Sequence, residues 1–363
     1  MKKNNYMQTV ERNKLFLKRQ LMDGILFKAD IQENPHYIHE ERDSSWGDRE
    51  CLSLSDPAYV LRRCHQNTKI YKEVDDDTIP WAYPTCHFGE AFYSAILGGE
   101  IQFVGNGYNT CSGAKPVVHT IEDLEKLQNY KNNYWVGIFA DSAKHFAKEA
   151  NGDFWLQYLI TIDALNLAVE LLGSTEAYYM LYEDVELVKN IMEFGIDFNN
   201  WFYLLQKDIY EKNNRIALAD DELYELYDKT WYSIDAYDIC DPAMYKVFGM
   251  EYQQELISKV GGGKLHTHGT GLLRLLPHIS QLKGLSVMQI GRDLYSGEWL
   301  EFEHLADIRK QTGDIPLSVY VSPQEFLDGI KNKTLPGGVE YCCSVCDVEE
   351  ANRLAYMAKE YRV

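Results

Sequence analysis

The feature that most constrains this chain is a regular alternation of apolar runs and helical patterns over its second half. Short runs typical of β-strands are followed there by segments whose apolar residues recur at helical spacing. With Leu265, Val287, Val319 and Cys343 as centres, successive runs are 22, 32 and 24 residues apart, about the length of a strand plus a crossover helix. The alternation therefore predicts a parallel sheet. The expected strands lie at 215–219, 264–268, 285–290, 317–321 and 339–345, and the expected helices at 242–260, 272–281, 302–311 and 323–331.

The chain length and two missing signals favour one closed barrel over a doubly wound sheet. A chain of 363 residues has room for two average domains or for one barrel with insertions. No linker divides it, and no phosphate-binding glycine fingerprint follows a first strand. We therefore expect an α/β protein with a single (β/α)8 TIM barrel over residues 1–363. Residues 1–75 carry an amphipathic helix at 10–22 and then a polar stretch, and they are expected to form a helical and loop extension packed on the barrel.

The composition excludes several classes of partner. The chain has 36 basic and 55 acidic side chains and a net charge of −19, which repels nucleic-acid backbones and anionic membrane surfaces. No window approaches the roughly 18 apolar residues of a membrane span, and no secretory signal begins the chain. We expect a cytoplasmic protein with reduced thiols, because eight cysteines are too sparse for a disulfide scaffold. The acidic run Asp75–Asp77 is interpreted as a solvated loop.

The strongest local signal for chemistry is a histidine pair at the end of a predicted strand. His266 and His268 are two residues apart, so a strand places both imidazoles on one face, and Gly269 ends the strand where barrel active sites lie. A third ligand from the cluster Cys342, Cys343 and Cys346 would complete a zinc site with one open position. Two other interpretations stay open. Such a pair also binds substrate carboxylates or satisfies hydrogen bonds in the core, and such cysteines also fill apolar cores.

Two further segments are expected to line the same mouth. The segment Trp231–Asp238 offers carboxylates and phenols, and Asp235 in it would orient a ring or act as a general acid or base. Tyr232 of that segment, together with Tyr83 and His87 of an earlier loop, is expected to contact a cofactor.

Several stretches in the same order resemble the uroporphyrinogen decarboxylase superfamily, which includes the corrinoid-dependent methyltransferases. The resemblance covers most of the chain and implies a single (β/α)8 barrel with an open pocket at the carboxyl ends of its strands. The stretches that carry it are Ile79-Pro80 through Phe88-Gly89, Leu97-Gly98, Asp235 through Asp241-Pro242, Phe248, His266-Thr267-His268-Gly269, Leu276-Pro277, Gly284-Leu285, Glu349-Glu350-Ala351 and Tyr361-Arg362.

The methyltransferase branch binds zinc through a His-x-Cys pair and a cysteine on the last strand. The resemblance implies that His266 and His268 form this pair here, with His268 in place of the first cysteine, and that Cys342 or Cys343 lies near the position of the second. Of the two, Cys343 is the expected third ligand. It implies Zn²⁺ as cofactor and a methylcorrinoid, free or carried by a corrinoid protein, as methyl donor to a thiol or related acceptor. Asp235 would position groups or handle protons.

Two alternative functions remain at this stage. The decarboxylases carry an Arg-Gln-Ala-Gly-Arg-Tyr stretch that has no counterpart at residues 20–60. A metal-free decarboxylase acting on a porphyrinogen-like or other carboxylated substrate would use His266 and His268 to bind the leaving carboxylate. A non-catalytic barrel would bind a tetrapyrrole or cobamide.

Overall fold

A seven-stranded parallel sheet forms the centre of the protein. The computed structural model describes residues 3–32, 57–82, 91–105, 110–150, 153–213, 220–291 and 304–363. The strand order in the sheet is β1-β11-β10-β9-β8-β7-β6, and every neighbouring pair is parallel. This confirms the predicted parallel sheet. The strands are β1 (Ile25–Ile31), β6 (Thr161–Ile162), β7 (Trp231–Ser233), β8 (Gly263–His268), β9 (Leu285–Gly291), β10 (Leu317–Val321) and β11 (Val339–Val345).

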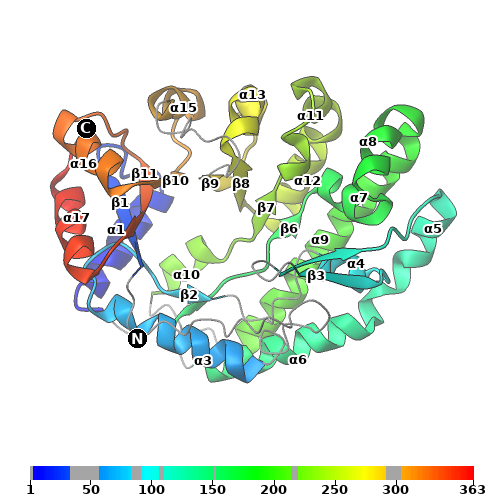
Figure 1. The fold of residues 1–363 in the computed structure, drawn as a ribbon, viewed down its shortest axis with the longest axis horizontal. Helices are drawn as coiled ribbons and strands as arrows, with labels where there is room; N and C mark the ends of the chain where they lie inside the picture. Colours follow the sequence, from blue (N-terminus) through cyan, green and yellow to red (C-terminus); the bar gives the residue numbers. More distant parts are fainter. Residues whose placement is uncertain are drawn as a thin grey trace.

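The helices lie outside the strands. Figure 1 shows the strands as an inner arc, with α17, α16, α15, α13, α11 and α12 following one another along its outer side. No helix in the described ranges is both long and apolar enough to pass through a bilayer. The helices are α1 (Tyr6–Leu17), α3 (Pro57–Asn67), α4 (Phe92–Ile96), α5 (Ile121–Lys126), α6 (Tyr134–Glu149), α7 (Ala164–Leu172), α8 (Ser174–Glu183), α9 (Val185–Asn213), α10 (Asp221–Tyr227), α11 (Pro242–Phe248), α12 (Met250–Val260), α13 (Gly269–Ile279), α15 (Leu305–Thr312), α16 (Pro323–Asn332) and α17 (Val348–Glu360).

Four strands and most of the intervening helices match the sequence prediction closely. The runs expected at 264–268, 285–290, 317–321 and 339–345 are β8, β9, β10 and β11. The single helix expected at 242–260 is divided into α11 and α12 at Gly249, where an added Cβ would lie 2.3 Å from the ring of Tyr245. The strand expected at 215–219 lies outside the described residues. The other expected strands of the second half alternate with helices as predicted.

The interpretation of residues 1–75 as an extension of helices and loops is wrong at β1. Residues Ile25–Ile31 form a strand that pairs with β11 along its whole length and lies at one end of the main sheet. Lys28 and Asp30 interrupt the apolar run and hide the strand in the sequence, although five of its seven residues are buried. The sheet therefore begins at residue 25.

The acidic run at residues 75–77 is also not a solvated loop. Asp76 and Asp77 are fully buried. Asp76 pairs with the ammonium of Lys3 at 2.5 Å, and Asp77 pairs with Nε of Arg12 at 2.7 Å. The same two carboxylates accept hydrogen bonds from backbone amides of β1. Only Asp75 is exposed, so this segment attaches the N-terminus and α1 to the sheet.

The segment that follows Asp77 continues beside β1 toward the other end of the sheet. The amide of Asp77 donates to the carbonyl of Phe27 in β1. Farther along, β2 (Trp81–Ala82) pairs in parallel with β5 (Trp155–Leu156), which precedes β6 on the same stretch of chain. A separate antiparallel hairpin consists of β3 (Ile101–Gly105) and β4 (Thr110–Ala114).

The main sheet has an outer and an inner face. Phe326 of α16 contacts Phe27 and Tyr341, which defines the face toward the helices as the outer face. Residues in register share a face, and neighbours along a strand alternate. The inner face therefore carries a polar row across five neighbouring strands. Its members, in register, are Ser233, His266, Gln289, Ser318 and Glu340.

Candidate metal centre

His266 and His268 converge at the carboxyl end of β8. Their Nε2 atoms are 3.2 Å apart, and the two rings meet nearly at right angles. Both residues are partly exposed. The strand period puts them on the inner face, and β8 ends at His268, where α13 begins. The pair therefore presents two ring nitrogens toward one point.

Asp235 completes a group of three donors. It opens the short 3-10 turn η3 (Asp235–Tyr237), which is separated by one residue from the end of β7, the neighbour of β8. Its Oδ1 lies 3.5 Å from Nε2 of His268. One ligand atom from each of the three residues lies within 4.8 Å of the others. The sequence singled out Asp235 only for orienting groups or handling protons; the structure adds it to the potential ligands.

Gln289 orients the first imidazole. Its Oε1 lies 2.8 Å from Nδ1 of His266, and the two residues are in register on β9 and β8. Because an amide oxygen only accepts hydrogen bonds, Nδ1 of His266 carries the proton, and Nε2 keeps its lone pair. Sequence reasoning missed Gln289, although a glutamine within the apolar run of β9 was a usable signal.

Asn166 of α7 holds the turn that carries Asp235. Its Nδ2 lies 3.1 Å from both the carbonyl oxygen and Oγ of Ser233, and its Oδ1 accepts from the amide of Ala236 at 2.8 Å. The flanking residues of Asp235 are thus fixed to a helix N-terminus. No feature of the sequence pointed to Asn166.

The carboxyl group of Asp235 is held in its charged form. Partial burial acts to raise its pKa, but hydrogen bonds from His268 and Ser233 and the nearby imidazoles outweigh burial, so the pKa lies below its usual value. The side chain is 46% exposed. An ionised oxygen beside two imidazole nitrogens is a donor set that suits Zn²⁺.

Two of the three distances between the donor atoms match those around a zinc ion, and the third, between His266 and Asp235, is within 4.8 Å. Ligand atoms at about 2.0–2.1 Å from zinc in a tetrahedron lie roughly 3.3 Å from each other. The two distances at His268, 3.2 Å to His266 and 3.5 Å to Asp235, are close to that separation. Three protein ligands would leave a fourth position open, as in catalytic sites.

Cys343 does not reach this group. It is 1% exposed and lies in the main hydrophobic cluster, in register with Ala29 and Val321 on the outer face. The expected set of His266, His268 and Cys343 is corrected on this point, because one step along β11 turns the side chain to the opposite face. Cys342 faces inward, but burial and Glu340 raise the pKa of its thiol to about 12, which keeps it protonated.

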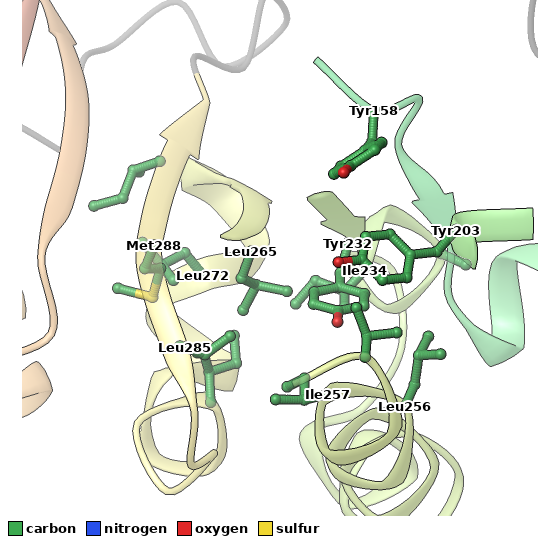
Figure 2. Packing of buried hydrophobic residues seen from close by; sticks show 14 of the residues in the cluster. Tyr158, Tyr203, Tyr232, Ile234, Leu256, Ile257, Leu265, Leu272, Leu285 and Met288 are labelled. Atoms are coloured by element: carbon green, nitrogen blue, oxygen red, sulfur yellow. The ribbon is translucent and has the colours of Figure 1, made fainter. Parts of the chain in front are cut away.

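Tyr232, expected at a cofactor, lies in the core instead. Its ring is fully buried on the outer face, and its hydroxyl donates to the carbonyl of Gly262 at 2.7 Å. Figure 2 shows it packed among buried residues of β8, α9 and α12. Tyr83 and His87, the other expected cofactor contacts, lie outside the described residues. The labelled neighbours of Tyr232 include Tyr203, Leu256, Ile257 and Leu265.

The evidence for the metal centre is therefore its geometry, and no homologous protein supports it. A scan against protein-family models finds no match to this chain, and a search of curated proteins finds no significant relative.

Proposed function

We propose that this protein is a zinc-dependent methyltransferase that moves a methyl group from a methylated corrinoid to a thiol or related acceptor. The observation that carries the proposal is the convergence of His266, His268 and Asp235 at the carboxyl end of a parallel sheet. Active sites of barrels with parallel strands lie at that end. The family resemblance in the sequence supplies the reaction class.

We further infer that the strands close into a (β/α)8 barrel. The main sheet has seven strands with β1 at one end and β6 at the other, so one more strand between these two would close it. The segment 77–82 meets β1 through the hydrogen bond from Asp77 to Phe27, and meets the stretch before β6 through the pairing of β2 with β5. If the segment 77–82 is counted as an eighth strand, between β1 and the stretch 155–162 that contains β6, the strands occupy eight positions around a ring.

The reaction is a displacement at carbon. The acceptor sulfur forms a bond to the methyl carbon, the cobalt–carbon bond breaks, and both electrons of that bond stay with the cobalt. The thiol proton passes to solvent water before the attack. Bound zinc would stabilise the thiolate near neutral pH, whereas a free thiol has a pKa of about 8.5.

The chain's own residues would hold and shape the centre. Nε2 of His266, Nε2 of His268 and a carboxylate oxygen of Asp235 would be the ligands. Gln289 keeps the Nε2 lone pair of His266 available, and Asn166 keeps the turn at Asp235 in place. The partial exposure of Asp235 and His268 leaves room for an acceptor to approach.

Metal analysis tests the ligand group directly. We expect the wild-type protein to bind one zinc ion per chain, and His268→Ala to weaken binding at least tenfold. His145→Ala, which removes an exposed histidine on α6, is the matched control and should bind like the wild type. A wild-type protein that takes up no zinc would end this proposal.

An activity assay tests the reaction. Methylcobalamin and a small thiol, incubated with the zinc-loaded protein, should yield the methyl thioether at a rate that a chelator abolishes. His268→Ala should be inactive and His145→Ala fully active. Zinc binding without any turnover of methylcobalamin would keep the centre and remove the methyl-transfer assignment.

One observation favours a second candidate, a metal-free decarboxylase. Lys264 lies on the inner face two residues before His266, with its ammonium 4.8 Å from the Tyr227 ring and 5.4 Å from the Trp231 ring. Within the described part of the chain it has no ion pair, so a substrate carboxylate would complement it. Release of carbon dioxide that persists in a chelator would select this function.

A further inference from the structure

A cavity lies near the carboxyl end of β1, and its described wall contains none of the three donor residues of the metal centre. Its volume is about 220 Å³, which is below the ~300 Å³ at which pockets begin to hold drug-sized molecules. A ligand here would therefore be small. The wall is built by β1, the end of α3, the 3-10 turn η1 (Lys69–Lys72) and the segment up to β2. The residues that matter below are Asp30, Thr68, Tyr71 and Trp81.

Asp30 is the single charged residue in the described wall of this cavity. Its carboxylate accepts hydrogen bonds from Gln32 at 3.0 Å and from Ser344 at 3.3 Å, both neutral groups. No cation of the described residues lies within ion-pair distance of it. The nearest basic residue along β1, Lys28, is taken by Glu340 at 2.6 Å. Among the described residues, nothing neutralises the negative charge that the cavity presents.

Two aromatic rings share the wall with this carboxylate. Trp81 is 49% exposed, unusually high for a tryptophan on a strand, and Tyr71 is partly buried beside it in the lining. Burial, with the carboxylates of Asp76 and Asp30, raises the pKa of Tyr71, so the phenol stays neutral. The faces of tryptophan and tyrosine attract cations.

The other polar side chains of the described wall, Asn67, Thr68 and Thr78, are neutral. The hydroxyl of Thr78 donates to a carboxylate oxygen of Asp76. The hydroxyl of Thr68 donates to the carbonyl of Cys64 at 2.7 Å and is therefore already used as a donor. No lysine, arginine or histidine is present in the described wall to bind an anion. One carboxylate is too few for a hard divalent cation, which takes six or more oxygen ligands.

We propose that this cavity binds a small organic ammonium ion, with Asp30 opposite the charge and Trp81 and Tyr71 against its methyl or methylene groups. Alkylammonium recognition by aromatic rings and a carboxylate needs no proton transfer and no metal. The proposal does not depend on the function proposed for the metal centre. In the sheet, β11, β10 and β9 lie between β1 and β8, and none of the three donor residues lines the cavity.

Tetramethylammonium and tert-butanol are a matched pair of probes, because they have similar shapes and differ in charge. We expect ligand-observed NMR at constant ionic strength to show saturable binding of tetramethylammonium to the full chain. The affinity for tert-butanol should be at least tenfold lower. Equal affinity for both probes, or no saturable binding of tetramethylammonium, would overturn the proposal.

Three variants locate the site. Asp30→Asn should weaken tetramethylammonium binding at least tenfold, and Trp81→Leu at least fivefold. Asp75→Asn removes an exposed carboxylate outside the cavity wall and should leave the affinity unchanged; an equal loss in this control would show general charge attraction only. Circular dichroism of each variant checks the fold, and Trp81→Leu tests the site if Asp30→Asn fails to fold.

The metal-centre variant separates the two proposals. His268→Ala should bind tetramethylammonium like the wild type, whether or not it binds zinc. A loss of ammonium binding in His268→Ala would place the probe at the metal centre and contradict a separate cavity site.

Discussion

Nδ1 of His266 lies 2.8 Å from Oε1 of Gln289, the residue directly in register with it on the neighbouring strand. The bond selects one tautomer of the imidazole and directs its free nitrogen toward His268 and Asp235. A strand register, set by the whole sheet, thus determines which atom of His266 can bind a metal ion.

Gln289→Leu should therefore weaken zinc binding by about 10- to 100-fold, the usual effect of losing a group that orients a metal-binding histidine. The measurement is competition with a zinc-sensitive dye. Gln289→Glu supplies the matched control, because a carboxylate also accepts from Nδ1 and should retain binding within a few-fold. Equal losses in both variants would indicate that packing, and not the hydrogen bond, matters at this position.

The buried acidic segment should contribute strongly to stability. Asp77→Ala leaves the guanidinium of Arg12 without its partner and the amide of Phe27 without an acceptor. Loss of one member of a buried ion pair typically costs about 3–5 kcal/mol in the free energy of unfolding. Urea denaturation should detect this decrease.

Asp75→Ala is the control for that experiment, since Asp75 is exposed and exposed substitutions usually change stability by about 0.5 kcal/mol or less. Similar losses of stability in the two variants would contradict the buried role of Asp77. The comparison also separates the ion pair from any general effect of removing negative charge, of which the chain has an excess.

The sequence predicted the second half of the sheet because β8 to β11 are each five residues or longer and are separated by regular helices. It did not predict β6 and β7, which have two and three residues and are too short for a periodic signal. The burial of Asp76 and Asp77 depends on Lys3 and Arg12, residues far away in the sequence. Local composition carries no information about such partners.

At the metal centre too, the local sequence predicts only part of the arrangement. His266 and His268 could be placed on one face from their spacing alone, because both lie on one strand. Choosing between Cys342 and Cys343 requires the register of β11 against its neighbours, and a shift of one residue exchanges the two faces. Glu340 is a charged residue in a mostly buried strand, so its position indicates the inner face of β11. Cys342, two residues later, lies on the same face.

Lys264 should make the stability of the protein depend on pH. Burial and the ammonium of Lys28 lower its pKa to about 8, whereas an unfolded lysine has a pKa of about 10.4. Between these values the unfolded chain binds more protons, so stability rises with pH. Lys264→Met removes this contribution and should be more stable than the wild type at pH 7, by on the order of 1–3 kcal/mol, with the gain shrinking toward pH 10.

Urea denaturation at pH 7, 8.5 and 10, with a chelator present so that no metal contributes, would measure this gain. Lys246→Met changes an exposed lysine on α11 and should give a small difference that does not vary with pH. A pH-independent gain in Lys264→Met would mean that Lys264 is equally protonated in the folded and unfolded chains across this range.

The third ligand gives the sharpest test of the metal centre. Asp235 lies on the inner face beside His268, and Cys343 lies on the outer face in the hydrophobic core. Asp235→Ala should therefore lower zinc affinity at least tenfold, whereas Cys343→Ala should leave it within twofold and cost about 1 kcal/mol of stability through the lost buried group. Zinc titrations and urea denaturation of both variants give the two readouts. The reverse pattern, with zinc lost in Cys343→Ala and retained in Asp235→Ala, would require β11 to shift by one residue and bring a thiolate to the histidine pair.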